Sequence, residues 1–189
     1  MRLVSGQFGG REIRSVCGPG YRPATSKVRQ AVFSMLEARG VRWPGLRVLD
    51  LFAGTGSLAL EALSRGAAFA AFVEKNRKAA AAIQGTLKDL GLGADRARVH
   101  AADLFALLKG RPDAPFDVLF VDPPYGQGLL LPALELALAC GWVAPQAVVL
   151  AEVEARLELD PGAAHPSLAP LADKTYGQTR ILAWTNSAA

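Results

Sequence analysis

Cysteine and histidine are scarce in this chain. Its 189 residues include two of each, and Cys17 and Cys140 lie far apart, without the short spacing that metal ligands need. We therefore expect reduced, isolated thiols and no metal centre.

Long apolar runs are also missing. Residues 1–7 lack the apolar core of a secretory signal, and the most apolar later stretch, residues 129–143, is interrupted by Pro132 and Glu135. We expect no membrane span and a cytoplasmic protein. The content of 51% hydrophobic and 20% charged residues is typical of a globular protein, and the length favours one domain with a small appendage.

Acidic residues are rare at the start of the chain. Residues 1–47 hold nine basic and two acidic side chains, a net charge of +7, whereas the rest holds 12 basic and 15 acidic, a net charge of −3. A basic leader on a mildly acidic body is typical of a polyanion-binding appendage on a catalytic domain. A solvated arm without a partner is the alternative.

Short apolar runs alternate with segments of helical periodicity. The runs predict strands over residues 47–51, 69–74, 97–101, 117–121 and 147–152. Helices are expected over residues 26–39 and 57–65, between Asn76 and Gly91, and over residues 104–109 and 129–140. This alternation predicts an α/β fold with a doubly wound, mostly parallel sheet. Residues 168–184 predict a terminal hairpin instead.

A glycine turn follows the first predicted strand. Residues 50–56, Asp-Leu-Phe-Ala-Gly-Thr-Gly, lead into a helix, so Gly54 and Gly56 permit a tight turn and the close approach of a ligand. Glu74 ends the next strand, 20 residues after Gly54, where an acid accepts hydrogen bonds from ribose hydroxyls. A nicotinamide-dependent dehydrogenase shares this pattern and is one alternative.

Asp50 favours a ligand with a cationic amino-acid group over a dinucleotide. Its carboxylate would repel a pyrophosphate but suits a cationic amino-acid group. Asp103, at the end of a later strand, adds an acid that can meet an adenine amine. Because ligands bind at the carboxyl ends of parallel strands, the three acids predict a site for S-adenosylmethionine, which joins adenosine to an aminocarboxypropyl group through a positive sulfur.

The tetrapeptide Asp122-Pro123-Pro124-Tyr125 follows the apolar run at residues 118–121. A nucleobase amine is a poor nucleophile because its lone pair is delocalised into the ring. The Asp122 carboxylate and the Pro123 carbonyl can accept hydrogen bonds from the two N–H groups of such an amine, which aims its lone pair at a methyl group. Tyr125 can stack on a base that has left its helix. A rigid turn after a strand is the structural alternative.

Two groups of residues resemble a known family. Residues 48–56 together with 122–125 resemble the class I methyltransferases that act on exocyclic amines. The opening segments 6–11, 22–25 and 28–29 are similar to the RsmD family, which methylates the N2 amine of a guanine in small-subunit 16S ribosomal RNA. The resemblance implies a Rossmann-like, seven-stranded sheet with an antiparallel C-terminal hairpin. It also implies a basic RNA-binding extension over residues 1–44 and a methyltransferase domain over residues 45–189.

The resemblance assigns roles residue by residue. It implies that the cofactor S-adenosylmethionine is held by Asp50, Ala53, Gly54, Gly56, Glu74, Asp103 and Asp122. It implies that the catalytic residues, which hold the guanine, are Asp122, Pro123, Pro124 and Tyr125. It implies that RNA is gripped by Arg11, Arg22, Thr25 and Arg29. The expected partner is ribosomal RNA or an assembling small ribosomal subunit, bound by a monomer.

Other functions share parts of these motifs. An N6-adenine methyltransferase acting on DNA has the same tetrapeptide, and a protein-glutamine methyltransferase uses a similar geometry but has no need of a basic leader. A cofactor domain that has lost catalysis and serves only as an RNA-binding or ribosome-assembly module is an alternative from another class. It would bind RNA without methylating it.

Overall fold

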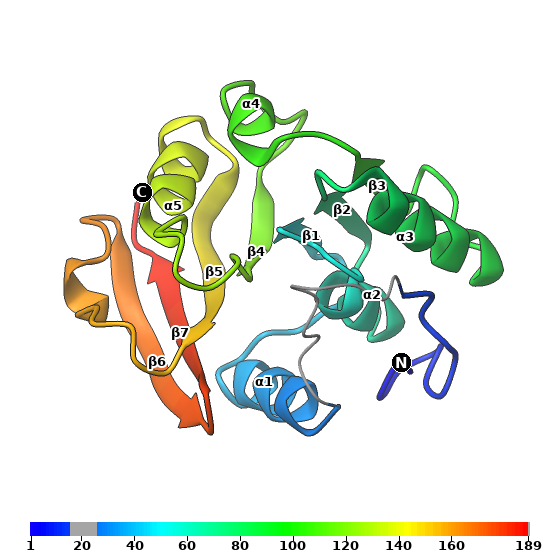
Figure 1. Ribbon diagram of the computed structural model, residues 1–189, viewed down its shortest axis with the longest axis horizontal. Coiled ribbons are helices and arrows are strands. Elements are labelled where there is room, and N and C mark those ends of the chain that lie inside the picture. The colour runs from blue at the N-terminus through cyan, green and yellow to red at the C-terminus, as the bar shows by residue number, and fades with distance from the viewer. Residues whose placement is uncertain (16–25, 189) are drawn as a thin grey trace.

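In the computed structural model, which describes residues 1–15 and 26–188, seven strands form one mixed sheet (Figure 1). The strand order is β3-β2-β1-β4-β5-β7-β6. The strands are β1 (Arg47–Leu51), β2 (Phe69–Val73), β3 (Ala97–His100), β4 (Phe116–Val121), β5 (Val143–Glu154), β6 (Leu168–Tyr176) and β7 (Thr179–Asn186). The first five are parallel, and β7 runs antiparallel to both β5 and β6. The predicted fold class is confirmed.

Helices connect the parallel strands. Those of the described residues are α1 (Ser26–Ala38), α2 (Ser57–Ser64), α3 (Arg77–Asp89), α4 (Leu104–Leu108), α5 (Leu130–Ala139) and the short 3-10 helix η1 (Pro161–Ala163). Asn76 caps α3 as expected, because its Oδ1 accepts hydrogen bonds from the amides of Lys78 and Ala79 at 2.9 and 3.2 Å. These bounds match the sequence-based prediction closely.

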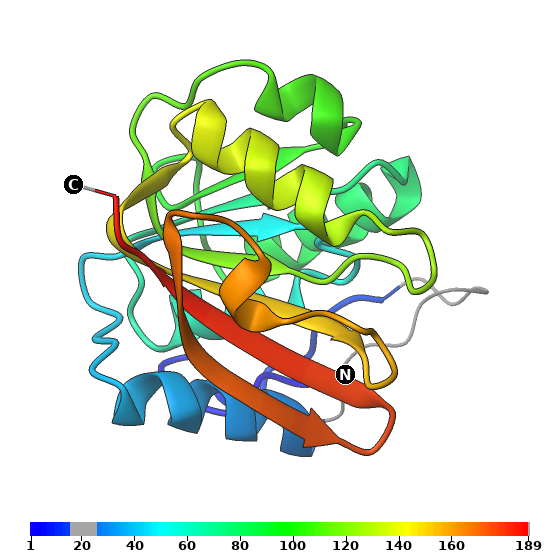
Figure 2. The same ribbon diagram turned by 90° about the vertical axis from the view of Figure 1, so that its left-hand side faces the viewer.

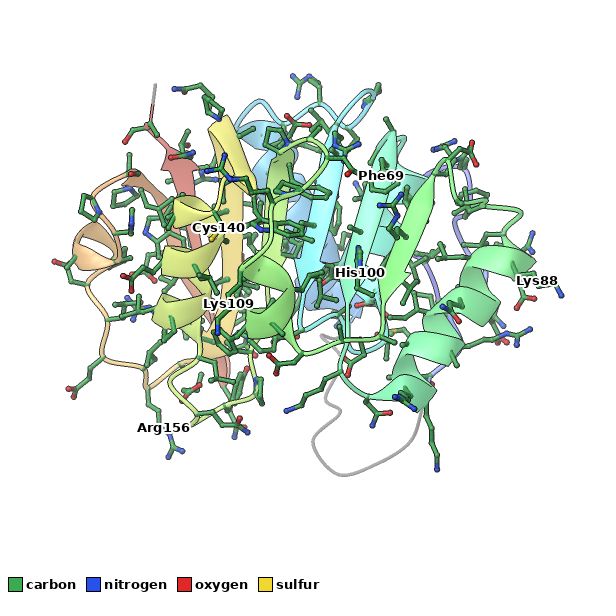
Figure 3. The ribbon with its side chains drawn as sticks, turned by 90° about the horizontal axis from the view of Figure 1, so that it is seen from above. Phe69, Lys88, His100, Lys109, Cys140 and Arg156 are labelled. Carbon is green, nitrogen blue, oxygen red and sulfur yellow. The ribbon has the colours of Figure 1, made fainter. Side chains whose placement is uncertain are left out.

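The helices cover both faces of the sheet. One apolar cluster joins α1, α2 and α3 to one face, where the Phe33 and Phe120 rings lie 5.8 Å apart. The other cluster joins α4 and α5 to the opposite face, which Figure 3 shows from that side. Successive strand residues point to opposite faces, so Leu119 belongs to the second cluster and Phe120 to the first. This two-sided core is that of a doubly wound sheet.

The C-terminal hairpin of β6 and β7 extends one edge of the sheet (Figure 2). β5 pairs with β7 from Val148 to Glu154 and begins four residues earlier than predicted. An irregularity in the β4 and β5 register, with Gln146 at φ 62°, lets the strand continue past Pro145. Trp184 of β7 is buried and donates a 2.8 Å hydrogen bond to the Pro161 carbonyl.

Residues 1–15 pack against α2. Leu3 and Ile13 are buried in the cluster that contains α1 and α2, so the predicted N-terminal extension shares its core with the sheet. Gly6, at φ 80°, approaches α2 so closely that a Cβ atom would lie 1.9 Å from the Ser64 carbonyl oxygen. The Gln7 amide donates to that same oxygen at 2.7 Å. This glycine of the opening motif therefore serves close packing.

Candidate active site

A large cleft opens at the carboxyl edge of the sheet, where β1 and β4 lie side by side. The strand order reverses at this point, which is where open α/β sheets bind ligands. The volume of the cleft is about 1140 Å³, above the usual range of small-molecule pockets. The sequence-predicted residues that line it are Asp50, Ala53, Gly54, Glu74, Asp103, Asp122, Pro123, Pro124 and Tyr125.

The loop after β1 uses backbone conformations that favour glycine. Phe52, Gly54 and Gly56 have φ values of 63°, 57° and 72°. Gly54 lines the cleft and donates its amide to Glu74 Oε2 at 2.8 Å. Gly56 is absent from the described lining, and a Cβ atom there would lie 3.1 Å from the Phe72 ring. Gly56 therefore allows α2 to pack against β2, while Gly54 shapes the cleft.

Asp50 lies at the end of β1, beneath this loop. Its side chain is buried, with 2% of the residue exposed, and its Oδ2 accepts a hydrogen bond from the Ala59 amide at 3.3 Å. Burial raises the pKa of Asp50 well above its ordinary value; the Ala59 amide opposes this rise and the charge of Glu74 adds to it. A cationic group of a ligand would favour the ionised carboxylate here.

Glu74 and Asp103 follow the neighbouring strands β2 and β3. Glu74 accepts the Asn76 amide at 2.7 Å and the Gly54 amide at 2.8 Å, one on each oxygen. Because a carboxylate offers about four lone-pair sites, it can still accept hydroxyl donors. Asp103 is exposed and caps α4, with Oδ1 accepting the Ala106 amide at 3.0 Å. Both acids combine a structural contact with free acceptor capacity in the cleft.

The tetrapeptide after β4 forms the opposite part of the lining. Pro123 is buried, and Tyr125 is 43% exposed. The Tyr125 hydroxyl lies 3.3 Å from Thr179 Oγ1, and the Gly126 amide donates to Glu154 Oε1 at 3.0 Å. These two contacts attach the loop to β5 and β7 and leave an aromatic surface accessible.

Glu152 of β5 lies next to Asp122 at the point where β4 ends. Val121 of β4 pairs with Ala151 of β5, so the residues that follow them are neighbours on the sheet face that also carries Asp50. Glu152 is 5% exposed and lines the cleft. Burial raises the pKa of Glu152 to about 7. Burial, together with the charges of Glu152 and Asp50, raises the pKa of Asp122 well above its ordinary value.

This acid pair has a functional signature. Among the described residues, no hydrogen-bond donor reaches the carboxyl group of Asp122 or of Glu152. Buried acids with raised pKa values in a cleft are candidates for binding cations or N–H donors. The sequence-based prediction named Asp122 but missed Glu152, although Glu152 ends a predicted strand just as Glu74 does.

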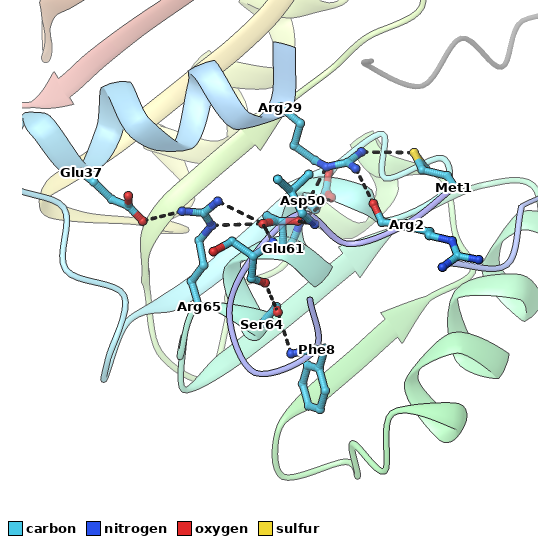
Figure 4. Close-up of polar contacts among 12 residues, drawn as sticks. Met1, Arg2, Phe8, Arg29, Glu37, Asp50, Glu61, Ser64 and Arg65 are labelled. Carbon is cyan, nitrogen blue, oxygen red and sulfur yellow. Dashed lines mark hydrogen bonds and ion pairs between the residues drawn. The ribbon is translucent and has the colours of Figure 1, made fainter. Parts of the chain in front are cut away.

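The prediction that Arg29 grips RNA is wrong. Its side chain is fully buried, with Nε 3.7 Å from Glu61 Oε2 and Nη2 donating to the Arg2 carbonyl at 2.6 Å (Figure 4). Burial lowers the pKa of Arg29, and the charge of Glu61 opposes the change. The guanidinium instead joins α1 to α2 and to the first residues of the chain.

The other residues predicted to bind RNA remain open. Arg22 and Thr25 lie outside the described residues. Arg11 is exposed, and its Nη2 donates to the Asp89 carbonyl at 2.8 Å, at the end of α3. Because α3 leads from β2 back to the start of the parallel β3, this contact lies at the sheet edge opposite the cleft.

Neither a metal-binding cluster nor a membrane-spanning helix occurs in the described part of the chain. Within residues 1–15 and 26–188, no group of three or more His, Cys, Asp or Glu residues is placed to hold a metal ion. No helix in this part is both long enough and apolar enough to cross a membrane.

Known proteins share both the sequence and the fold. The family described as Conserved hypothetical protein 95 matches residues 1–185. Ribosomal RNA small subunit methyltransferase D from Escherichia coli K12 is 38% identical over 155 residues, which cover 82% of this chain and 75% of that protein. The protein of the same name from Haemophilus influenzae is 32% identical over 158 residues, and the alignment covers 82% of this chain and 79% of that protein.

The solved structure of the Escherichia coli protein yhhF aligns over the whole fold. It is 31% identical, with a TM-score of 0.86, and the alignment covers 100% of this chain and 99% of that one. The glycine loop, the strand-end acids and the tetrapeptide thus occur in a fold and a sequence family shared with ribosomal RNA methyltransferases. The chain belongs to the Conserved hypothetical protein 95 family, the RsmD family of methyltransferases.

Proposed function

We propose that this protein transfers a methyl group from S-adenosylmethionine to the N2 amine of a guanine in small-subunit ribosomal RNA. One observation carries the proposal: the acids suited to a methyl donor and the tetrapeptide suited to an amine line one cleft, at the ends of neighbouring strands. The names of the relatives and the resemblance to the RsmD family support this substrate.

The residues near β1 and β2 fit the donor. Asp50 is a buried carboxyl group with a single amide donor, so a cationic amino group would complete its environment. Glu74 retains acceptor capacity for the two ribose hydroxyls, and Asp103 can accept from the adenine amine. When bound, S-adenosylmethionine supplies a methyl group on a positively charged sulfur.

The tetrapeptide fits the acceptor. The Asp122 carboxylate and the Pro123 carbonyl accept hydrogen bonds from the two N–H groups of the amine, which turns its lone pair toward the methyl group. Alignment of two reactants can lower a barrier by roughly 7 to 11 kcal/mol. Methyl transfer would break the S–CH3 bond and form an N–CH3 bond, and the amine would then release one proton to a carboxylate or to water. A nearby sulfonium and the bound N–H donors favour the ionised form of Asp122.

Tyr125 holds the base in place. Its exposed ring follows Asp122 and Pro123, which together we call the acceptor corner, and the hydroxyl contacts Thr179. Stacking of a base on an aromatic ring contributes about 1 to 3 kcal/mol. A target base in a helix would have to swing out to reach this surface.

Mass spectrometry of the product tests the proposal. The purified protein, S-adenosylmethionine carrying a labelled methyl group, and small-subunit RNA, free or as an assembling subunit, should give labelled N2-methylguanosine at one nucleotide. Labelled N6-methyladenosine would identify the adenine alternative instead. RNA binding without any label would show that the chain is a non-catalytic binding module.

A further inference from the structure

The acceptor corner contains one more acid than amine alignment requires. Asp122 and the Pro123 carbonyl suffice for the two hydrogens of an amine, yet Glu152 lies at the adjacent strand end in the same cleft. Neighbouring strands lie only about 4.8 Å apart, so the two carboxyl groups reach the same part of a bound base. The contacts described above give Glu152 no structural role, because no donor of the described residues bonds to its side chain.

The hydrogen-bond pattern of guanine matches this third acceptor. Guanine presents the N2 amine beside an N1–H group, which makes three donor hydrogens on two neighbouring nitrogens. Adenine places an N1 lone pair beside its N6 amine, so a carboxylate at that position would face an acceptor. A flipped base is read through hydrogen bonds to this edge.

We propose that Glu152 is a specificity-determining residue, whose carboxylate accepts the N1–H of guanine while Asp122 and Pro123 hold the N2 amine. This inference rests on the proposed function. It explains how an Asp-Pro-Pro-Tyr motif, which by itself suits any planar amine, selects guanine over adenine.

The electrostatics of the cleft agree with this assignment. Two neighbouring acids in a cleft cannot both ionise without cost, and burial raises the pKa of Glu152 to about 7. A base with three donor hydrogens would satisfy both carboxylates together. A base with a lone pair at N1 would leave an ionised Glu152 unpaired, and sites with buried hydrogen-bonding groups strongly reject such ligands. A Glu152 that keeps its proton could instead donate to that lone pair, so the discrimination belongs to the ionised form, which the bound N–H donors and a nearby sulfonium favour.

The test uses RNA with 2-aminopurine at the nucleotide that mapping identifies. 2-Aminopurine keeps the N2 amine but has a lone pair at N1. The wild-type protein should methylate the guanine RNA faster than the 2-aminopurine RNA by at least about 30-fold in kcat/KM, since a hydrogen bond to a charged group is lost. A smaller ratio would overturn the proposal, whether or not any variant folds.

The variant Glu152→Gln assigns the discrimination to this residue. Its side chain can accept from N1–H or donate to an N1 lone pair, so the ratio between the two RNAs should fall by at least about tenfold. The exposed Glu158→Gln is the matched control and should keep the wild-type ratio. Because 2-aminopurine also lacks the O6 atom, an unchanged ratio in Glu152→Gln would place the discrimination elsewhere and refute the inference. A wild-type protein that does not methylate guanine N2 at all would instead refute the proposed function.

Discussion

Three acids gather on one face of the sheet at the cleft, and each has a raised pKa. Asp50, Asp122 and Glu152 come from three strands, and in each case burial is the main cause of the shift. Ionisation of three neighbouring acids destabilises the fold, so we expect a ligand whose positive charge and N–H donors offset their repulsion. A sulfonium with an amino group, next to a base rich in N–H donors, has the required charge and hydrogen-bonding pattern.

Removal of the Asp122 carboxylate should stop methyl transfer without preventing donor binding. We expect Asp122→Ala to lower turnover by at least about 100-fold, because one of the two groups that orient the amine is lost. Calorimetric titration with S-adenosylhomocysteine should still detect binding, with a Kd raised far less than turnover is lowered, because Asp50, Glu74 and Asp103 remain. The exposed Asp113→Ala is the matched control. Unchanged turnover in Asp122→Ala would refute the assignment of the acceptor corner.

Glu152 should make the protein less stable as the pH rises. Its pKa is about 7 in the folded protein and near 4.5 in the unfolded chain. Between these values the unfolded chain has released the proton and the folded protein retains it, so the free energy of unfolding falls with pH and the loss is complete above about pH 7. Glu152→Gln should remove a loss on the order of 3 kcal/mol, measured by urea unfolding at pH 4.5 and pH 8. Parallel pH profiles of the two proteins would contradict the raised pKa.

The residue scale also shows where sequence reasoning stops. Asp50, Glu74 and Asp122 could be predicted because each ends an apolar strand, and strand ends meet at one edge. Glu152 carried the same signal, but the sequence does not state that β5 pairs with β4. The sequence does not reveal that Arg29 is buried, because its partner Glu61 lies on another helix and becomes a neighbour only after folding.

At the scale of elements, the loop after β4 is attached to the strands beside it. Glu154 of β5 accepts the Gly126 amide, and Thr179 of β7 contacts the Tyr125 hydroxyl. The antiparallel hairpin therefore does more than extend the sheet, because the first residue of β7 contacts the loop that we propose holds the substrate. The sequence predicted the hairpin and the tetrapeptide separately but gave no sign of this contact.

Loss of the Thr179 hydroxyl should loosen this loop. We expect Thr179→Val to lower turnover by roughly 2- to 10-fold, consistent with one hydrogen bond of about 0.5 to 1.5 kcal/mol, and to speed hydrogen exchange at the Gly126 amide. Thr175→Val changes an exposed residue of β6 and serves as the control. Wild-type exchange and turnover in Thr179→Val would mean that the loop is held without this contact.

The N-terminal segment depends on close packing against α2. Gly6→Ala should lower the free energy of unfolding by more than about 1 kcal/mol, because a Cβ atom would collide with the Ser64 carbonyl and the residue has a positive φ. Gly10 has the same φ of 80° but nothing within 4 Å of its Cβ position, so Gly10→Ala isolates the backbone cost. Urea unfolding of both variants gives the difference. Equal losses of unfolding free energy in Gly6→Ala and Gly10→Ala would show that the close contact with Ser64 adds no cost to the substitution.

At the scale of the whole molecule, much of the basic charge near the start of the chain is used internally. Arg29 pairs with Glu61 and Arg14 with Asp89, two acids that lie outside residues 1–47. The net charge of residues 1–47 therefore overstates the charge that those residues offer to RNA. The fold itself followed from the sequence more fully, since the alternation of strands and helices, and the final hairpin, predicted the sheet that the molecule has.

The same strand order puts the proposed donor and acceptor subsites next to each other. β1 lies between β2 and β4, so the acids at the ends of β1 and β2 adjoin the tetrapeptide at the end of β4. A crystal structure of the complex with S-adenosylhomocysteine tests this arrangement most directly. We predict its ribose hydroxyls on Glu74, its amino group near Asp50 and its sulfur facing Asp122 and the Pro123 carbonyl. A sulfur directed away from that corner, or a ligand bound outside the cleft, would contradict the proposed methyl transfer.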